Sequence, residues 1–252
     1  MFLAQEALLF HPTERRGDVE RLRAEHDALA IKLDVEGAQL RGVLLPARGS
    51  SPAGPRPTIL YFGGNAESVT RSVERFDWAR ARGANVALLP YRGYDDSSGS
   101  PSAAGLRGDA IALYDHVRAL EGVDPERLYA FGFSLGTGVA TYLAHERPLA
   151  GVILAAPYAR LSDLAQQSYP WLPVRPLFRH DFDSLALAPE ITTPALIVHG
   201  EADTLIPIHE GERLRSSWAG AIELVPIASA GHNDLVRRAQ TTAAIESFVF
   251  GQ

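Results

Sequence analysis

Short, continuously apolar runs recur along the chain, and each is separated from the next by a segment with helical spacing. Four of these runs, at residues 59–62, 86–89, 152–154 and 196–198, contain no charged residue. Strands that are apolar on both sides are typical of a parallel sheet that helices cover on both faces. The alternation predicts βα units. We therefore expect an α/β fold with a mostly parallel central sheet of about eight strands and helices on both faces.

Two parts of the chain differ from this regular pattern, one near the N-terminus and one at residues 157–193. Residues 28–35 and 39–45 flank a short turn and predict an antiparallel hairpin, and a helix with one apolar face is expected over 68–82. The stretch 157–193 is rich in proline and aromatic residues, and it is too short to fold alone. We expect one domain over 1–252, with 157–193 as a short cap-like insertion.

Composition excludes several classes of function. The 24 Lys and Arg residues against 30 Asp and Glu residues give a net charge of −6, which argues against nucleic acid as a partner. The absence of cysteine excludes a thiol nucleophile, a cysteine-bound zinc and disulfides. Lys32 is the sole lysine, which is typical of a GC-rich genome, and a bacterial source is expected.

The N-terminal ten residues are apolar but lack the basic region and the cleavage site of a signal peptide. No stretch approaches the roughly 20 apolar residues of a membrane span. We therefore expect a cytoplasmic protein without a membrane span. A periplasmic or membrane-associated location stays open if the N-terminus was trimmed.

The sequence Gly-Phe-Ser-Leu-Gly at 132–136 matches the G-x-S-x-G motif. It falls where the predicted strand 127–133 runs into a predicted helix at 135–145. A sharp turn there lifts a serine clear of the sheet, and the glycines leave room for the strained backbone. The alternative is a serine that caps the helix beside packing glycines. The context favours Ser134 as a nucleophile.

A serine nucleophile needs a base, and the base needs an orienting acid. His232 lies in a polar loop after the last predicted strand, and Asp203 lies just beyond the strand 195–199. Ligands of an open α/β sheet gather at the carboxyl ends of its strands, where Ser134, Asp203 and His232 would converge. Glu201 is the close rival to Asp203 as the acid.

An acyl-transfer site also needs backbone N–H groups for the oxyanion. Leu135, the residue after the serine, supplies one. The loop Gly-Gly-Asn-Ala at 63–66 follows the strand 58–62, and its glycines let the backbone approach a tetrahedral intermediate. We therefore expect the Asn65 N–H to be the second donor. The alternative is a plain glycine turn into a helix.

Five segments together resemble the α/β-hydrolases, in the branch of esterases, lipases and serine-aminopeptidase-like enzymes. They occur in family order at 62–66, 91–102, 132–136, 199–207 and 231–234. Relatives often have His at the position of Gly63 and Gly at the position of Asp95, and many carry a membrane helix before a segment like 7–12. The resemblance implies the α/β-hydrolase fold, hydrolysis of an ester, thioester or amide, and neither metal nor organic cofactor. In relatives the segment 91–94 positions the oxyanion loop, and we favour that role over a place in the pocket.

The function most consistent with these residues is a serine hydrolase that cleaves carboxylic esters or thioesters of small molecules through an acyl-enzyme. One alternative is an exopeptidase or amidase, which would need a carboxylate for the free amine of its substrate; Asp163, Asp181 and Asp183 are available. A second alternative is a binding protein of the same fold that no longer catalyses a reaction.

The substrate pocket is predicted to be lined by Gly64, Tyr158 and Trp171. Alternatively, the aromatic residues of the insertion could form a small core. The natural substrate and the oligomeric state stay open.

Overall fold

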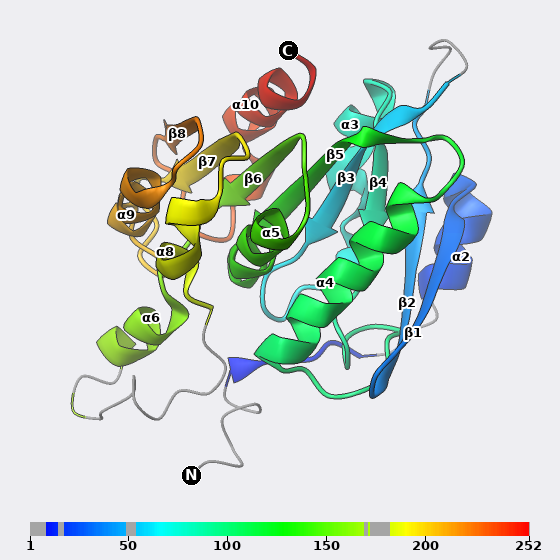
Figure 1. Ribbon diagram of the computed structural model, residues 1–252, viewed down its shortest axis with the longest axis horizontal. Helices are drawn as coiled ribbons and strands as arrows, with labels where there is room; N and C mark the ends of the chain where they lie inside the picture. The colour runs from blue at the N-terminus through cyan, green and yellow to red at the C-terminus, as the bar shows by residue number, and fades with distance from the viewer. Residues whose placement is uncertain (1–8, 15–17, 49–53, 169–170, 172–181, 252) are drawn as a thin grey trace.

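The computed structural model describes residues 9–14, 18–48, 54–168, 171 and 182–251, and these build an eight-stranded sheet (Figure 1). The strand order is β1-β2-β4-β3-β5-β6-β7-β8. The predicted hairpin is confirmed: β1 (Leu29–Val35) and β2 (Ala38–Leu45) pair antiparallel, and β2 pairs antiparallel with β4. The hairpin therefore forms one edge of the sheet.

The remaining strands are all parallel to one another, as their apolar sequences predict. They are β3 (Arg56–Phe62), β4 (Asn85–Leu88), β5 (Val123–Phe133), β6 (Gly151–Ala155), β7 (Ala195–Gly200) and β8 (Ile222–Ile227). Their carboxyl ends lie at one edge of the sheet, so the loops that follow β3, β5, β7 and β8 meet there.

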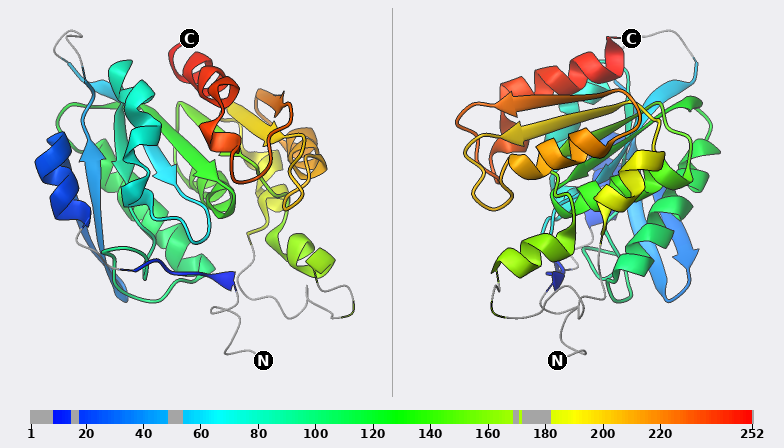
Figure 2. Two further views of the ribbon diagram at one scale, coloured as in Figure 1. Left: turned by 180° about the vertical axis from the view of Figure 1, so that it is seen from behind. Right: turned by 60° about the vertical axis from the view of Figure 1, so that its left-hand side comes forward.

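Helices cover both faces of the sheet (Figures 1 and 2). On one face pack α4 (Ala103–Arg118), α5 (Leu135–Glu146) and α9 (His209–Ser217), and on the other α2 (Asp18–His26), α3 (Asp77–Ala81) and α10 (Ala239–Phe250). The strands bury side chains on both sides, which gives two hydrophobic clusters with the sheet between them. The predicted α/β fold is confirmed.

The predicted helix over 68–82 is broken into η2 (Val69–Arg71), η3 (Val73–Phe76) and the five-residue α3. The Ser72 hydroxyl donates to the Ser68 carbonyl and to the Glu67 carboxylate, at 3.3 and 3.0 Å. Such local side-chain bonds compete with helical ones. The prediction of one long helix is therefore wrong, because these turns fold around Glu67.

The ends of the insertion 157–193 lie within the described residues, and 169–170 and 172–181 lie outside them. Its first half contains α6 (Leu161–Ser168), and its second half contains α8 (Ser184–Leu187) and η4 (Ala188–Glu190). A β-bridge between Arg160 and Asp183 joins the two halves. That the insertion acts as a cap on a single domain stays a prediction. In the described part of the chain, no helix has the length and apolar character needed to cross a bilayer.

Candidate active site

Ser134 occupies the turn between β5 and α5. Its backbone has φ 51° and ψ −115°, a sparsely populated conformation that costs a non-glycine residue about 1–3 kcal/mol. Two glycines permit this turn. A Cβ on Gly132 would lie 2.3 Å from the Gly136 carbonyl oxygen, and one on Gly136 would lie 2.0 Å from that of Phe62. The motif therefore builds the strained turn that was predicted from it.

The loops after β5, β7 and β8 bring Ser134, Asp203 and His232 together. His232 Nε2 lies 2.9 Å from Ser134 Oγ, and His232 Nδ1 lies 2.8 Å from Asp203 Oδ2. The Phe133 ring packs on the imidazole with ring centroids 5.2 Å apart. The three side chains form one continuous hydrogen-bonded chain. With its proton on Nδ1, the imidazole would accept the serine hydroxyl proton.

The Asp203 side chain is fully buried and has several hydrogen-bond donors. Its Oδ1 accepts from the N–H groups of Leu205 and Ile206, both at 2.9 Å. Burial alone would raise the pKa of Asp203, but the hydrogen bonds from His232 and from these N–H groups lower it below its ordinary value. Asp203 is therefore a carboxylate beside the imidazole. Glu201, its rival in the sequence, is exposed.

His199 supports the turn that carries Asp203. This residue is completely buried, and its Nε2 lies 2.8 Å from the Ile206 carbonyl oxygen, a distance at which the N–H donates to it. Burial lowers the pKa of His199 below its ordinary value of 6.5, although that hydrogen bond opposes the shift. The buried His199 side chain is thus a neutral imidazole, and it lies on β7, two strands away from β5, which precedes Ser134.

Acidification is expected to destabilise the protein through His199. Because the pKa of His199 is lower in the folded than in the unfolded chain, the unfolded chain binds more protons below about pH 7.5, and the stability falls as the pH drops through 6.5. Urea unfolding at pH 7.5 and 5.5 should show a smaller loss of stability in His199→Gln than in the wild type. Equal losses in the two proteins would contradict this linkage.

The loop at 63–66 is held by hydrogen bonds on several sides. The Tyr91 hydroxyl donates to the Gly63 carbonyl at 2.8 Å, and the Gly64 N–H donates to the Glu67 carboxylate at 2.7 Å. Glu67 thus occupies the Gly64 N–H, which is therefore not available to an oxyanion. The Asn65 N–H has no acceptor among the described residues.

Leu135 supplies a second N–H group that has no acceptor among the described residues. It is the first residue of α5, and N–H groups in the first turn of a helix have no partner within that helix. The positive end of the helix dipole lies at the same place and favours negative charge. The N–H groups of Asn65 and Leu135, which are predicted to bind an oxyanion, thus both lack an acceptor among the described residues.

The segment 91–94 contacts the loop at 63–66, which supports its predicted positioning role. Besides the Tyr91 bond to Gly63, the Tyr94 hydroxyl donates to Asn65 Oδ1 at 2.9 Å. The two tyrosine rings pack edge to face with centroids 5.7 Å apart. Burial raises the pKa of both hydroxyls, so both stay protonated as donors.

A sequence profile of the serine aminopeptidase S33 family matches residues 53–180. The matched stretch is about half of the chain; it includes the loop at 63–66 and Ser134, and it ends before Asp203 and His232. The chain belongs to the serine aminopeptidase S33 family of α/β-hydrolases.

Relatives of this S33-family chain share its core at moderate identity. The uncharacterized protein Rv2307c of Mycobacterium tuberculosis is 34% identical over 79% of this chain and 70% of that protein. The lysophosphatidylserine lipase ABHD12 of Xenopus tropicalis is 34% identical over 67% of this chain and 48% of its own length. The chain thus spans about half of that lipase.

Two solved structures show the same fold at low identity. Est1E of Butyrivibrio proteoclasticus with bound ferulic acid has a TM-score of 0.71 and 19% identity, over 88% of this chain and 99% of that one. A puromycin-hydrolyzing peptidase of Mycobacterium tuberculosis has a TM-score of 0.72 and 17% identity, over 88% and 38%. At such identities the likeness supports the α/β-hydrolase fold alone.

The three predicted pocket residues of this S33-family chain lie in different environments. Gly64 faces the Phe133 ring, because a Cβ on it would lie 3.1 Å from that ring. Tyr158 is 1% exposed, and its hydroxyl donates to the Leu135 carbonyl at 3.2 Å, so its observed contacts support α5 from within the core. Trp171 is 74% exposed, and both of its chain neighbours lie outside the described residues.

The carboxylates considered for binding an amine are paired where the structure describes them. Asp163 lies 3.1 Å from Arg213, and Asp183 lies 2.7 Å from Arg160. Asp181 lies outside the described residues. The two described carboxylates are thus neutralised by arginines of the same chain.

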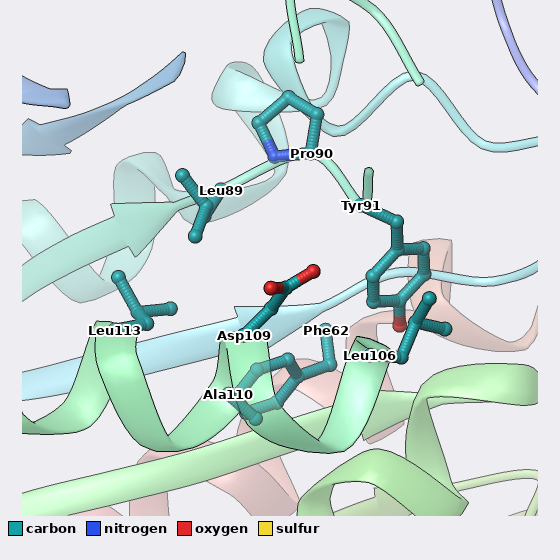
Figure 3. Close-up of a pocket in the computed structure, with 8 residues that line it drawn as sticks. All are labelled: Phe62, Leu89, Pro90, Tyr91, Leu106, Asp109, Ala110 and Leu113. Carbon is teal, nitrogen blue, oxygen red and sulfur yellow. The ribbon is translucent and has the colours of Figure 1, made fainter. Parts of the chain in front are cut away.

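Two hollows of this S33-family chain lie apart from Ser134. A cavity of about 10 Å³ is enclosed by Phe62, Leu89, Pro90, Tyr91, Leu106, Asp109, Ala110 and Leu113 (Figure 3). It has room for about one water molecule, which suits a packing gap behind Tyr91. An open groove of about 590 Å³ is lined by Arg71, Ser72, Glu74, Arg75, Trp78, Val236, Arg237 and Thr242. Neither hollow includes Ser134, Asp203 or His232.

Glu67 contacts the loop at 63–66 and was not among the residues predicted from the sequence. Its carboxylate accepts from the Gly64 N–H, from the Tyr61 hydroxyl at 3.0 Å and from Arg75 at 2.6 Å. These partners lie three to eight residues away in the sequence, and Tyr61 lies on β3. A carboxylate three residues after a glycine in a strand-to-helix turn was the available signal, because such a residue can bond back to an N–H of the turn.

Proposed function

We propose that this protein is a serine hydrolase of carboxylic esters, thioesters included, that works through an acyl-enzyme on Ser134. The observation that carries the proposal is the continuous hydrogen-bonded chain from Ser134 through His232 to Asp203. The N–H groups of Asn65 and Leu135, which have no acceptor among the described residues, support it as donors to an oxyanion. Such a constellation is identified by geometry and roles, and it recurs in acyl-transfer enzymes on unrelated folds.

In the proposed reaction, Ser134 Oγ attacks the carbonyl carbon of the ester, while His232 Nε2 takes the hydroxyl proton. Asp203 holds the Nδ1–H tautomer and stabilises the imidazolium. The carbonyl oxygen gains negative charge, which the N–H groups of Asn65 and Leu135 stabilise. The intermediate collapses, the alcohol leaves with the proton from His232, and the acyl group stays on Ser134. A water molecule then releases the acid by the same steps.

Two observations favour an ester over a peptide substrate. A relative that is 34% identical is named a lysophosphatidylserine lipase. The carboxylates Asp163 and Asp183 are paired with arginines, whereas an exopeptidase needs a carboxylate that can bind the free amine of its substrate. The family description supports the exopeptidase as the second candidate.

The proposal is tested with an active-site probe and a substrate panel. A fluorophosphonate should label the purified protein on Ser134, and p-nitrophenyl esters should be hydrolysed faster than aminoacyl p-nitroanilides. Labelling with turnover of aminoacyl anilides alone would favour the exopeptidase. The absence of labelling would favour a binding protein with a hydrolase fold.

We expect kcat/KM to peak at short to medium acyl chains. Only about 37 residues, 157–193, separate β6 from β7, so any cap is small. Each buried CH₂ contributes up to about 0.8 kcal/mol until the acyl pocket is full. A series of p-nitrophenyl esters from acetyl to palmitoyl would measure the profile, and Trp171→Ala should flatten it without abolishing turnover. A steady rise up to palmitoyl would contradict a shallow pocket.

A further inference from the structure

Residues 9–14, which we call the N-terminal strap, run beside the loop that follows β3 (Figure 2). Phe10 anchors the strap, because its ring is 1% exposed and belongs to the same hydrophobic cluster as Tyr91 and Tyr94. Thr13 anchors it a second time, since its hydroxyl accepts from the Asp95 N–H at 3.0 Å. The strap is thus fixed on both sides of His11.

The contact between the strap and the loop passes through the side chain of Asn65. Asn65 Nδ2 donates to the Leu9 carbonyl at 2.7 Å, and the His11 N–H donates to Asn65 Oδ1 at 3.0 Å. The amide thus pairs with the strap backbone at two residues that are two apart, as a neighbouring strand would. The His11 N–H also lies 3.0 Å from the Tyr94 hydroxyl oxygen.

These bonds stabilise a loop whose backbone conformation is uncommon. Ala66, the residue after Asn65, has φ 59°, and its N–H is also bonded to Asn65 Oδ1, at 3.1 Å. With its amide held by four hydrogen bonds, the Asn65 Cα–Cβ direction is fixed, and with it the direction of the backbone N–H. Tyr91 and Glu67 hold only the two residues before it.

We infer that the N-terminal strap is a positioning element of the oxyanion site, and that the Asn65 side chain connects it to the Asn65 N–H. The inference rests on the proposed function, in which that N–H stabilises the oxyanion. Asn65 thus has two tasks: its backbone faces the reacting carbonyl oxygen, and its side chain binds the strap. Without the strap the amide would bond to water, and the loop would populate other conformations.

The test removes the strap contact without changing the oxyanion donors. His11→Pro deletes the N–H of the strap that bonds to Asn65 Oδ1. Asn65→Ala deletes the amide but keeps its own backbone N–H. Loss of one oxyanion donor costs about 10²–10³ in kcat, and a misplaced donor should cost part of that. We expect each variant to lower kcat at least tenfold with little change in KM. His11→Ala keeps the N–H and should stay within about twofold of the wild type, because its contact is made by the backbone.

Inhibition by a trifluoromethyl ketone is a second measurement, and its Ki would not change if the strap only stabilised the fold. The adduct of this ketone with a serine carries an oxyanion, so its Ki should rise by the same factor as kcat falls. Titration with a fluorophosphonate counts the active sites, which separates slower turnover from partial unfolding. The double variant His11→Pro/Asn65→Ala should be no slower than the worse single variant, since both remove one contact.

The outcomes separate this inference from the proposed function. A wild-type enzyme that hydrolyses esters, with variants whose kcat per titrated site is unchanged, would overturn the role of the strap alone. A wild-type protein that neither hydrolyses esters nor reacts with the fluorophosphonate would overturn the proposed function and this inference with it. If His11→Pro does not fold, Asn65→Ala decides.

Discussion

Replacing Ser134 by alanine is expected to lower kcat by about 10⁵- to 10⁶-fold, because the residues of such a triad act as a unit and nothing else in the site can carry the acyl group. The fold should survive, since the Ser134 hydroxyl bonds only to His232 among the residues that the structure describes. Initial rates with a p-nitrophenyl ester measure the loss, and thermal unfolding checks the fold. The fluorophosphonate adduct should disappear from the peptide that contains residue 134.

Ser216→Ala is a matched control, because Ser216 is an exposed serine on α9 whose hydroxyl bonds only to the Glu212 carbonyl. It should retain wild-type turnover and labelling. A Ser134→Ala variant that keeps a tenth of the wild-type activity would show that another residue is the nucleophile.

Asp203→Asn is expected to lower kcat by about 10⁴-fold. The amide is nearly isosteric, but its NH₂ group would face His232 Nδ1 or the N–H groups of Leu205 and Ile206. In the first orientation the imidazole loses the acceptor that fixes its tautomer, and in the second the NH₂ group faces two N–H donors. In both orientations the imidazolium loses its counter-charge. The ratio of kcat values at the pH of maximal activity measures the effect.

Glu201→Gln is the control for the acid, because Glu201 lies two residues away and is exposed. It should leave kcat within about twofold of the wild type. Should Glu201→Gln be inactive while Asp203→Asn turns over normally, the acid would have to be reassigned.

Much of the fold could be predicted because its signals are local. The apolar runs indicate where the parallel strands lie, and the hairpin of β1 and β2 follows from a turn between two strand-like segments. The prediction of one helix over 68–82 is wrong for a physical reason. The apolar spacing there is helical, but Glu67 and Ser72 form bonds that a regular helix would not allow.

The candidate site could be predicted for a related reason. In a parallel sheet the residues that follow the strands meet at one edge, so Ser134, Asp203 and His232 could be brought together from strand order alone. The choice of Asp203 over Glu201 could not, because it depends on which of two carboxylates turns inward. The structure buries Asp203 against His232 and leaves Glu201 exposed.

The sequence by itself thus determined the α/β sheet, the strained turn at Ser134 and the candidates at its edge, since these follow from periodicity and from short motifs. The tertiary structure alone decided that the N-terminal strap holds the loop at 63–66. Asn65 meets the strap across 54 to 56 residues of chain, and those bonds are made with the backbone atoms of Leu9 and His11. Every residue except proline offers the same N–H and carbonyl groups, so no side-chain pattern indicates such a contact. The packing of Phe10 into the core and the bond between Thr13 and Asp95 bring these groups to the loop.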